Sequence, residues 1–308
     1  MLALAQASGD RSLEVNAHGW LCSDLFELGD IVGATDENAR ELDLANELRL
    51  PELRWSALVR RACVSLWAGR LDEAEQLADQ ALQAGQQAEI PTAMQMFGVA
   101  QMVLRRLRGG LEELIPLVSA MVEQYPLIPA WRSGLAYIYR ELGRAEEARK
   151  QLEVLAADDF STIPRDGNWM VAMAILSLVC HLVDDKERAA VLYDLLSPFE
   201  EFVVLAGLPA DALGSTHHFL MLLAATLRRW EDLERHAHEA LTRHEEMRTP
   251  AWLATTQIEL ANVLIARNRT EDASRARSLL EASLAVSGEF GFSALADRAH
   301  LAFEHLGN

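Results

Sequence analysis

Five histidines lie close together in the sequence and are of a type that could support chemistry: His217, His218, His236, His238 and His244. Imidazole nitrogens bind zinc, and these side chains could converge if the stretch folds into two antiparallel helices. The spacing argues against a metal site. His236 and His238 point in nearly opposite directions on a helix, and His244 follows His238 by six residues, whereas a zinc-protease motif needs four. We therefore expect solvated or hydrogen-bonded histidines and no metal site.

The sequence also lacks the common motifs of phosphate binding and nucleophilic catalysis. A phosphate-binding loop needs a Gly-Lys pair after a glycine-rich turn, and the chain contains no Gly-Lys pair. The nucleophile pattern Gly-x-Ser-x-Gly is missing as well. Neighbouring acids, such as Glu146 and Glu147, fall in the first turn of an expected helix, where they stabilise the helix dipole. We therefore expect no catalytic residue, no cofactor and no enzymatic activity.

Composition restricts the partners that the chain can bind. The 308 residues are 50% hydrophobic and carry a formal net charge of −18. The hydrophobic content is that of a globular protein with a sizeable core, and the negative charge disfavours nucleic acid and anionic membrane surfaces. No apolar run reaches the ~18 residues of a membrane span. Three widely spaced cysteines, Cys22, Cys63 and Cys180, suit buried thiols in a reducing compartment, so we expect a cytoplasmic protein.

Prolines and glycines recur at regular intervals along the chain and indicate how the elements that position any site are organised. Prolines recur at 51, 91, 129, 164, 209 and 250, with gaps of 35 to 45 residues. Glycines lie near the middle of several of these units, at 29, 69, 109, 110 and 143, where a tight turn could join two helices. Such a period is typical of a repeat architecture, and each unit is expected to be a helical hairpin.

The apolar periodicity predicts seven helix pairs within a single domain, residues 1–308. The expected pairs are 12–28 with 34–48, 51–67 with 71–86, 92–108 with 112–124, 129–142 with 145–157, 167–183 with 186–198, 212–228 with 231–247, and 250–267 with 272–288. A single helix at 292–306 is expected to cap the last pair, with Asp297, Arg298 and Glu304 facing water. The segment 198–214 interrupts the pattern and is expected to form a bend or a bulged loop.

Residues at fixed offsets within these units resemble the tetratricopeptide repeat. Second helices carry small or apolar residues at the packing positions, such as Ala74, Ala78 and Ala81, and first helices carry the triplets LAYIY at 135–139 and LANVL at 260–264. The third unit departs from the pattern, with Gln101, Met102 and Arg105 in those places, and the units are longer than usual for the family. The resemblance implies an all-α fold, a right-handed superhelix of seven hairpins with a capping helix.

The lengthened repeats and elements such as STHHFLMLLAATLRRWEDLERHAHEAL are similar to one branch of that family. This branch comprises the C-terminal helical arrays of large bacterial signalling ATPases, including regulators of the maltose-activator type and cyclases fused to an ATPase module. The resemblance covers nearly the whole chain. It implies a bacterial interaction and sensing module, which binds a protein segment or a small effector. The missing Gly-Lys pair means that the ATPase activity does not transfer.

In the family resembled, the partner binds in the concave groove lined by the first helices. Projecting these positions onto the chain selects six polar or aromatic candidates for the groove: Arg106, Tyr137, Arg140, His181, His218 and Asn262. An arginine beside Tyr137 could bind a carboxylate or phosphate, so Arg140→Ala is expected to weaken ligand binding with little change in melting temperature. The alternative is that Arg140 pairs with Glu141 or with an acid of the next hairpin.

Three functions are compatible with the sequence. The first is the non-catalytic module of a signalling or transcriptional regulator, with a protein, a peptide or a small effector as partner and no cofactor. The second is an enzyme or small-molecule receptor built in the groove, and the third is a self-assembling scaffold or homo-oligomer. No direct contact with nucleic acid or membrane is expected.

Overall fold

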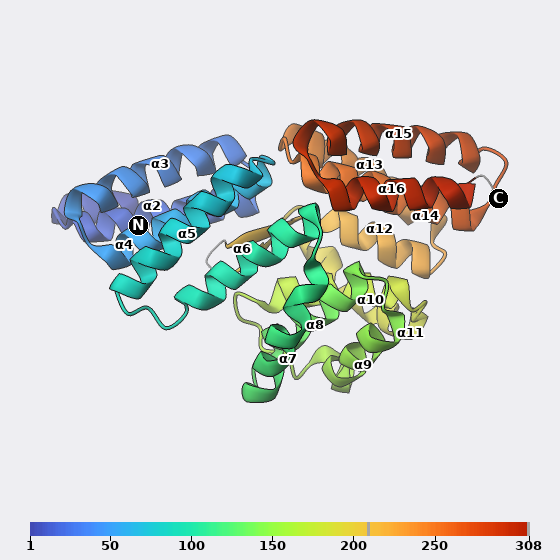
Figure 1. The fold of residues 1–308 in the computed structure, drawn as a ribbon, viewed down its shortest axis with the longest axis horizontal. Helices are drawn as coiled ribbons and strands as arrows, with labels where there is room; N and C mark the ends of the chain where they lie inside the picture. Colours follow the sequence, from blue (N-terminus) through green and yellow to red (C-terminus); the bar gives the residue numbers. More distant parts are fainter. Residues whose placement is uncertain (208–209, 307–308) are drawn as a thin grey trace. The chain divides into compact units, whose positions relative to one another are not determined.

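The computed structural model describes residues 1–207 and 210–306 and is all-α, with 79% of the chain in helices. Its described residues form 16 α-helices, three short 3-10 helices and one two-stranded sheet (Figure 1). The chain divides into two compact units. The first comprises Met1–Leu104 with Leu205–Leu213, and the second comprises Arg105–Val204 with Gly214–Asn308.

The first unit is built from helical hairpins near the N-terminus. Its helices are α1 (Leu2–Ser8), α2 (Arg11–Glu27), α3 (Ile31–Leu48), α4 (Pro51–Trp67), α5 (Leu71–Gln87) and the larger part of α6 (Ala93–Arg108). α2 packs on α3, and α4 packs on α5. Two of these helices start at residues that favour a helix N-terminus. Asp10 caps α2 by accepting hydrogen bonds from the backbone of Ser12 and Leu13, and Pro51 occupies the first turn of α4.

Trp55 belongs to an apolar core cluster of the first unit. It packs against Leu58 and Val59 on its own helix, against Ala81 of α5, and against Ala210 from the segment Leu205–Leu213. Ala210 is therefore part of this core although it lies far from the other residues in sequence. The Trp55 side chain is 6% exposed, so its ring contributes apolar surface to this core.

The second unit contains the remaining helices and most of the buried polar residues. Its elements are η1 (Leu111–Leu114), α7 (Ile115–Gln124), α8 (Pro129–Glu141), α9 (Ala145–Leu155), η2 (Ala157–Phe160), α10 (Trp169–Leu182), α11 (Lys186–Leu196), η3 (Ser197–Phe199), α12 (Thr216–Thr226), α13 (Trp230–Glu246), α14 (Pro250–Arg267), α15 (Asp272–Phe290) and α16 (Ser293–Leu306).

Neighbouring helices pack in the order expected of a helical repeat. Within hairpins, α8 contacts α9, α12 contacts α13, and α14 contacts α15. Between hairpins, α8 contacts α10, α10 contacts α12, and α12 contacts α14. An all-helical array with these contacts is compatible with a repeat architecture.

The expected turns confirm the hairpin interpretation. Gly69 adopts φ +76° between α4 and α5, a left-handed conformation that glycine takes without steric cost, and Gly143 does the same between α8 and α9. Where the sequence offers no glycine, Asp184 and Arg228 adopt positive φ instead. Helices occur in the ranges expected for the seven pairs, with most boundaries within one or two residues of the prediction. In six of these pairs the two helices pack on each other, whereas α7, the second helix of the third pair, packs on α8.

The segment 198–214 differs from the bend or bulged loop expected there. It contains two paired strands, β1 (Val203–Ala206) and β2 (Asp211–Ser215). The sixth hairpin consequently begins at Thr216 rather than at 212, because Ser215 caps α12 by accepting a hydrogen bond from the backbone of His217. Pro209, a member of the proline series, lies outside the described residues.

The last helix, α16, packs on α14 and α15, as a capping helix should. Its Leu295, Ala299 and Ala302 are buried, whereas Asp297 and Glu304 face solvent. None of the helices in the described part of the chain combines the length and the apolar character needed to cross a membrane. The short helix α1 was not expected from the sequence.

Candidate functional site

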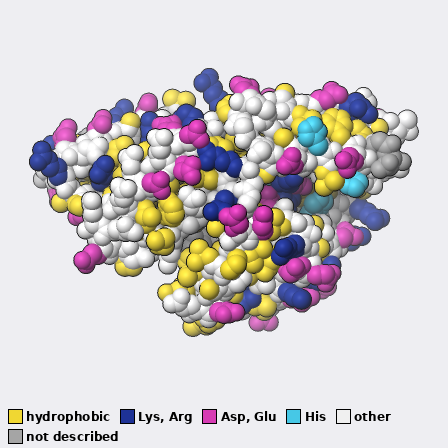
Figure 2. Space-filling model, in the orientation of Figure 1, with side chains coloured by type: hydrophobic (Ala, Val, Ile, Leu, Met, Phe, Trp, Pro, Cys, Tyr) yellow, Lys and Arg dark blue, Asp and Glu magenta, His cyan; other side chains and the backbone are white. Residues whose placement is uncertain are grey.

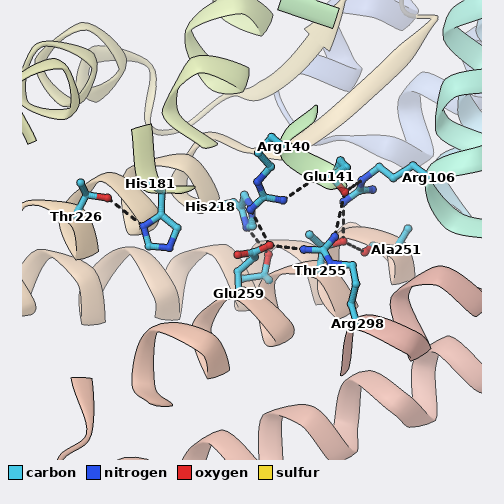
Figure 3. Close-up of polar contacts among 11 residues, drawn as sticks. Arg106, Arg140, Glu141, His181, His218, Thr226, Ala251, Thr255, Glu259 and Arg298 are labelled. Carbon is cyan, nitrogen blue, oxygen red and sulfur yellow. Dashed lines mark hydrogen bonds and ion pairs between the residues drawn. The ribbon is translucent and has the colours of Figure 1, made fainter. Parts of the chain in front are cut away.

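Arg140 lies at the centre of a buried ionic network in the second unit (Figure 3). It occupies the last turn of α8, and only 8% of its surface is exposed. Its guanidinium donates one hydrogen bond to the adjacent Glu141 and another, 2.7 Å long, to Oε1 of Glu259 on α14. Arg140 thus pairs with Glu141, as the alternative interpretation proposed. Its second partner, Glu259, comes from the seventh hairpin and not from the fifth, which is the next hairpin along the chain.

Two further arginines complete the network. Nε of Arg106 lies 3.0 Å from Oε2 of Glu141, and its Nη2 donates to Thr255 at 2.9 Å. Arg298 on α16 donates to Glu141 at 3.0 Å and also to Glu259. Arg298 was expected to face water, but these two carboxylates draw its guanidinium inward. We call the five charged residues, Arg106, Arg140, Glu141, Glu259 and Arg298, the buried ionic network.

Aromatic packing positions one edge of the buried ionic network. The guanidinium carbon of Arg106 lies 4.6 Å from the centre of the Trp252 ring, a cation–π contact. The planar guanidinium can stack on the ring and still donate in its own plane to Glu141 and Thr255, a combination that a lysine could not provide.

The charges of the buried ionic network hold each other ionised. Burial by itself raises the pKa of Glu141, but the attraction of Arg298, Arg106 and Arg140 outweighs it and holds that pKa well below its usual range. Glu259 behaves likewise: burial raises its pKa, and the nearby arginines lower it to about 2. Both carboxylates are therefore ionised at neutral pH and are poor general bases.

Two predicted histidines lie beside the network and are neutral. Nδ1 of His218 is 2.8 Å from the hydroxyl of Thr256, and Nδ1 of His181 is 3.0 Å from that of Thr226. Burial lowers the pKa of His218 to about 3, because the attraction of Glu259 is offset by Arg140 and Arg106. Burial likewise lowers the pKa of His181. A neutral imidazole adds a hydrogen bond without adding charge to the network.

The six predicted groove residues thus have different environments. Arg106, Arg140, His181 and His218 come together around Glu141 and Glu259. The remaining two are separate cases: Tyr137 is buried on α8, and Asn262 is exposed on α14. Binding of a ligand by this set stays a prediction. A ligand carboxylate that reached Arg140 would have to displace Glu259.

Sequence reasoning missed Glu259 and Arg298, and one signal could have found the first of them. Glu259 is the only charged residue between Pro250 and Ala266, within a helix that is mostly buried. A single carboxylate on a buried helix requires a buried cation. Arg298 gives no such signal, because it lies among the polar residues of an amphipathic helix.

No family model matches the chain, and a search of curated proteins finds no match.

Proposed function

We propose that this chain is a non-catalytic interaction module that binds a segment of a partner protein. The observation that carries this proposal is a set of exposed apolar side chains on α7 and on the loop that follows it. Leu117 is 56% exposed, Leu127 is 92% exposed, and Ile128 is also exposed. Figure 2 shows hydrophobic side chains gathered over α7 and α8. We call Leu117, Tyr125, Leu127 and Ile128 the α7 apolar surface.

The exposure of these apolar side chains supports a surface that a partner protein could cover. Several large apolar residues lie exposed within a dozen positions. Burying each of these side chains against a partner would stabilise the complex by about 1.5–3 kcal/mol. Acidic residues flank the surface, with Glu112 and Glu123 exposed nearby in sequence. A complementary partner is therefore an amphipathic helix with apolar residues on one face and lysines or arginines beside them.

The buried ionic network supports a non-catalytic role. Its carboxylates and guanidinium groups satisfy each other, and the histidines beside it are neutral and hydrogen-bonded. Such a network fixes the packing of helices rather than presenting a reactive group. The regulatory context of the proposed interaction rests on the resemblance to the helical arrays of bacterial signalling ATPases.

Selection of peptides tests the proposal directly. A displayed library of helix-forming peptides is selected on the immobilised chain, and an enriched peptide is titrated by calorimetry. Leu117→Ser and Leu127→Ser should each weaken its binding about tenfold or more, since each removes roughly 1.5 kcal/mol or more of apolar burial.

Leu301→Ser is the matched control, because Leu301 is also exposed but lies on α16. It should leave the affinity unchanged. Failure to enrich any peptide, or equal binding by the α7 variants and the control, would contradict the proposal.

A further inference from the structure

Two histidines and one glutamate form a compact group outside the buried ionic network. His217 at the start of α12, His236 on α13 and Glu200 after η3 each offer a ligand atom, and these three atoms lie within 4.8 Å of one another. Among the described residues this is the group of histidine, cysteine and acidic side chains that is compact enough to hold a metal ion. From this geometry we infer that the chain binds one divalent transition metal ion, with zinc the best match, through Glu200, His217 and His236.

The two imidazoles are already oriented toward a common point. Nδ1 of His217 lies 2.8 Å from Nδ1 of His236. Two nitrogens bound to one zinc ion at 2.0–2.1 Å in tetrahedral geometry would lie about 3.3 Å apart. An outward shift of about half an ångström, shared between the two rings, would therefore admit the ion between them. Both rings are buried, so few alternative positions are open to them.

Tyr193 supplies an outer contact of the kind that metal-bound histidines require. Its hydroxyl lies 3.0 Å from Nε2 of His236, on the side of the ring away from His217. With the ion on Nδ1, the Nε2–H of His236 donates to the Tyr193 oxygen and fixes both the tautomer and the orientation of the ring. The rings of Tyr193 and His236 make an edge-to-face contact with their centroids 5.8 Å apart, and this contact holds the hydroxyl in place.

Arg235 competes with the metal ion for the same groups. Its Nη1 donates to Oε2 of Glu200 at 3.1 Å, and its Nη2 lies 3.0 Å from Nε2 of His236. Once the ion binds Glu200 and His236 donates through Nε2, Arg235 loses both partners. Asp232, whose Oδ1 lies 3.8 Å from Nη2 of Arg235, can retain the guanidinium. Arg235 is half exposed and can therefore move without unpacking the core.

The ligand set indicates which ion fits. Two imidazole nitrogens and one carboxylate oxygen suit zinc and related first-row ions, whereas magnesium and calcium prefer sites made only of oxygens. Three protein ligands leave one tetrahedral position for a water molecule. The sequence analysis argued against a metal site from the spacing of His236, His238 and His244 along one helix, whereas the two histidines of this group come from different helices of the hairpin.

Zinc titration of the metal-free chain, in competition with a chromophoric chelator, tests the inference. The chain should bind one zinc ion, and a cobalt-loaded sample should show the visible absorption of a tetrahedral site. Glu200→Gln, a substitution at a partly exposed residue, should weaken affinity about tenfold or more, and His236→Ala should abolish specific binding. Arg235→Ala should strengthen binding, because it removes the competitor.

His238→Ala is the matched control, since His238 is exposed on the same helix as His236. It should bind zinc as the wild type does. Circular dichroism of each variant confirms folding, and Glu200→Gln preserves the test if His236→Ala fails to fold. Wild-type affinity in Glu200→Gln or His236→Ala, or weaker binding by Arg235→Ala, would overturn the assignment.

Discussion

Glu259 accepts a 2.7 Å hydrogen bond from Nη2 of Arg140, although 119 residues separate the two in the sequence. Both side chains are almost completely buried. Glu259→Gln would leave Arg140 and Arg298 without one of their compensating charges. We expect a loss of about 3–5 kcal/mol in the free energy of unfolding, measured by urea denaturation.

Glu201→Gln is the control for that substitution. Glu201 pairs with Arg243 in the same unit, but its side chain is 73% exposed. The same chemical change there should cost less than about 1 kcal/mol. Equal losses in the two variants would show that the buried pair contributes no more than a surface pair. Because Arg140 is buried and paired with Glu141 and Glu259, we expect Arg140→Ala to lower the melting temperature as well.

The pKa of Glu259 predicts how stability depends on pH. Its pKa is lowered from 4.5 to about 2 in the folded chain. A carboxyl group with a lowered folded pKa stabilises the fold above its unfolded pKa and loses this contribution as pH falls through the folded pKa. The stability difference between wild type and Glu259→Gln should therefore shrink by about 3 kcal/mol between pH 4.5 and pH 2. Urea titrations at several pH values measure it, and a constant difference would contradict the prediction.

Leu295 anchors the capping helix. It is completely buried against the last hairpin, so Leu295→Ala removes apolar contacts and leaves a cavity. We expect a loss of about 2–5 kcal/mol in the free energy of unfolding. Leu301, on the same helix, is 55% exposed, and Leu301→Ala should change stability by less than about 0.5 kcal/mol. A capping role for α16 requires the two results to differ.

Gly214 is a position where only glycine fits. Its φ is +81°, and a Cβ there would lie 2.8 Å from the Trp252 ring and 2.9 Å from Nε2 of His244. Gly214→Ala should therefore destabilise the chain by at least about 1–2 kcal/mol through backbone strain alone. Gly134→Ala is the matched control, because Gly134 lies within α8 with open space around it. That control should instead stabilise the helix by roughly 0.5–1 kcal/mol, and thermal melts compare the two.

The hairpins could be predicted because their signals are local. Pro51 begins α4 at the expected residue, and Gly69 forms the expected turn after it. The strands β1 and β2 could not be predicted, because strands of four and five residues carry too little periodicity. Their pairing is a contact between chain segments, and it replaces the first turn of the expected sixth hairpin.

The site was predicted in part, for a similar reason. Arg106 and Arg140 could be selected because helical periodicity places them on the face that packs against other helices. Their carboxylate partner Glu259 comes from a distant helix, and the sequence offers no rule for which distant helices meet. His217 and His236 are a different case, because they lie on the two helices of one hairpin, where the sequence allowed the histidines to converge, and only the spacing along the second helix argued against a metal site.

The span of the buried ionic network has a consequence for the order in which the chain is synthesised. Arg298 lies 157 residues beyond Glu141, yet both are needed to balance the charges. While the ribosome has translated only as far as α14, the carboxylates of Glu141 and Glu259 still lack their last guanidinium. A nascent chain can therefore form the hairpins one after another, but this part of the core closes only after Arg298 has left the exit tunnel. The last step is then the docking of α16 on α14 and α15, which brings Arg298 to both carboxylates.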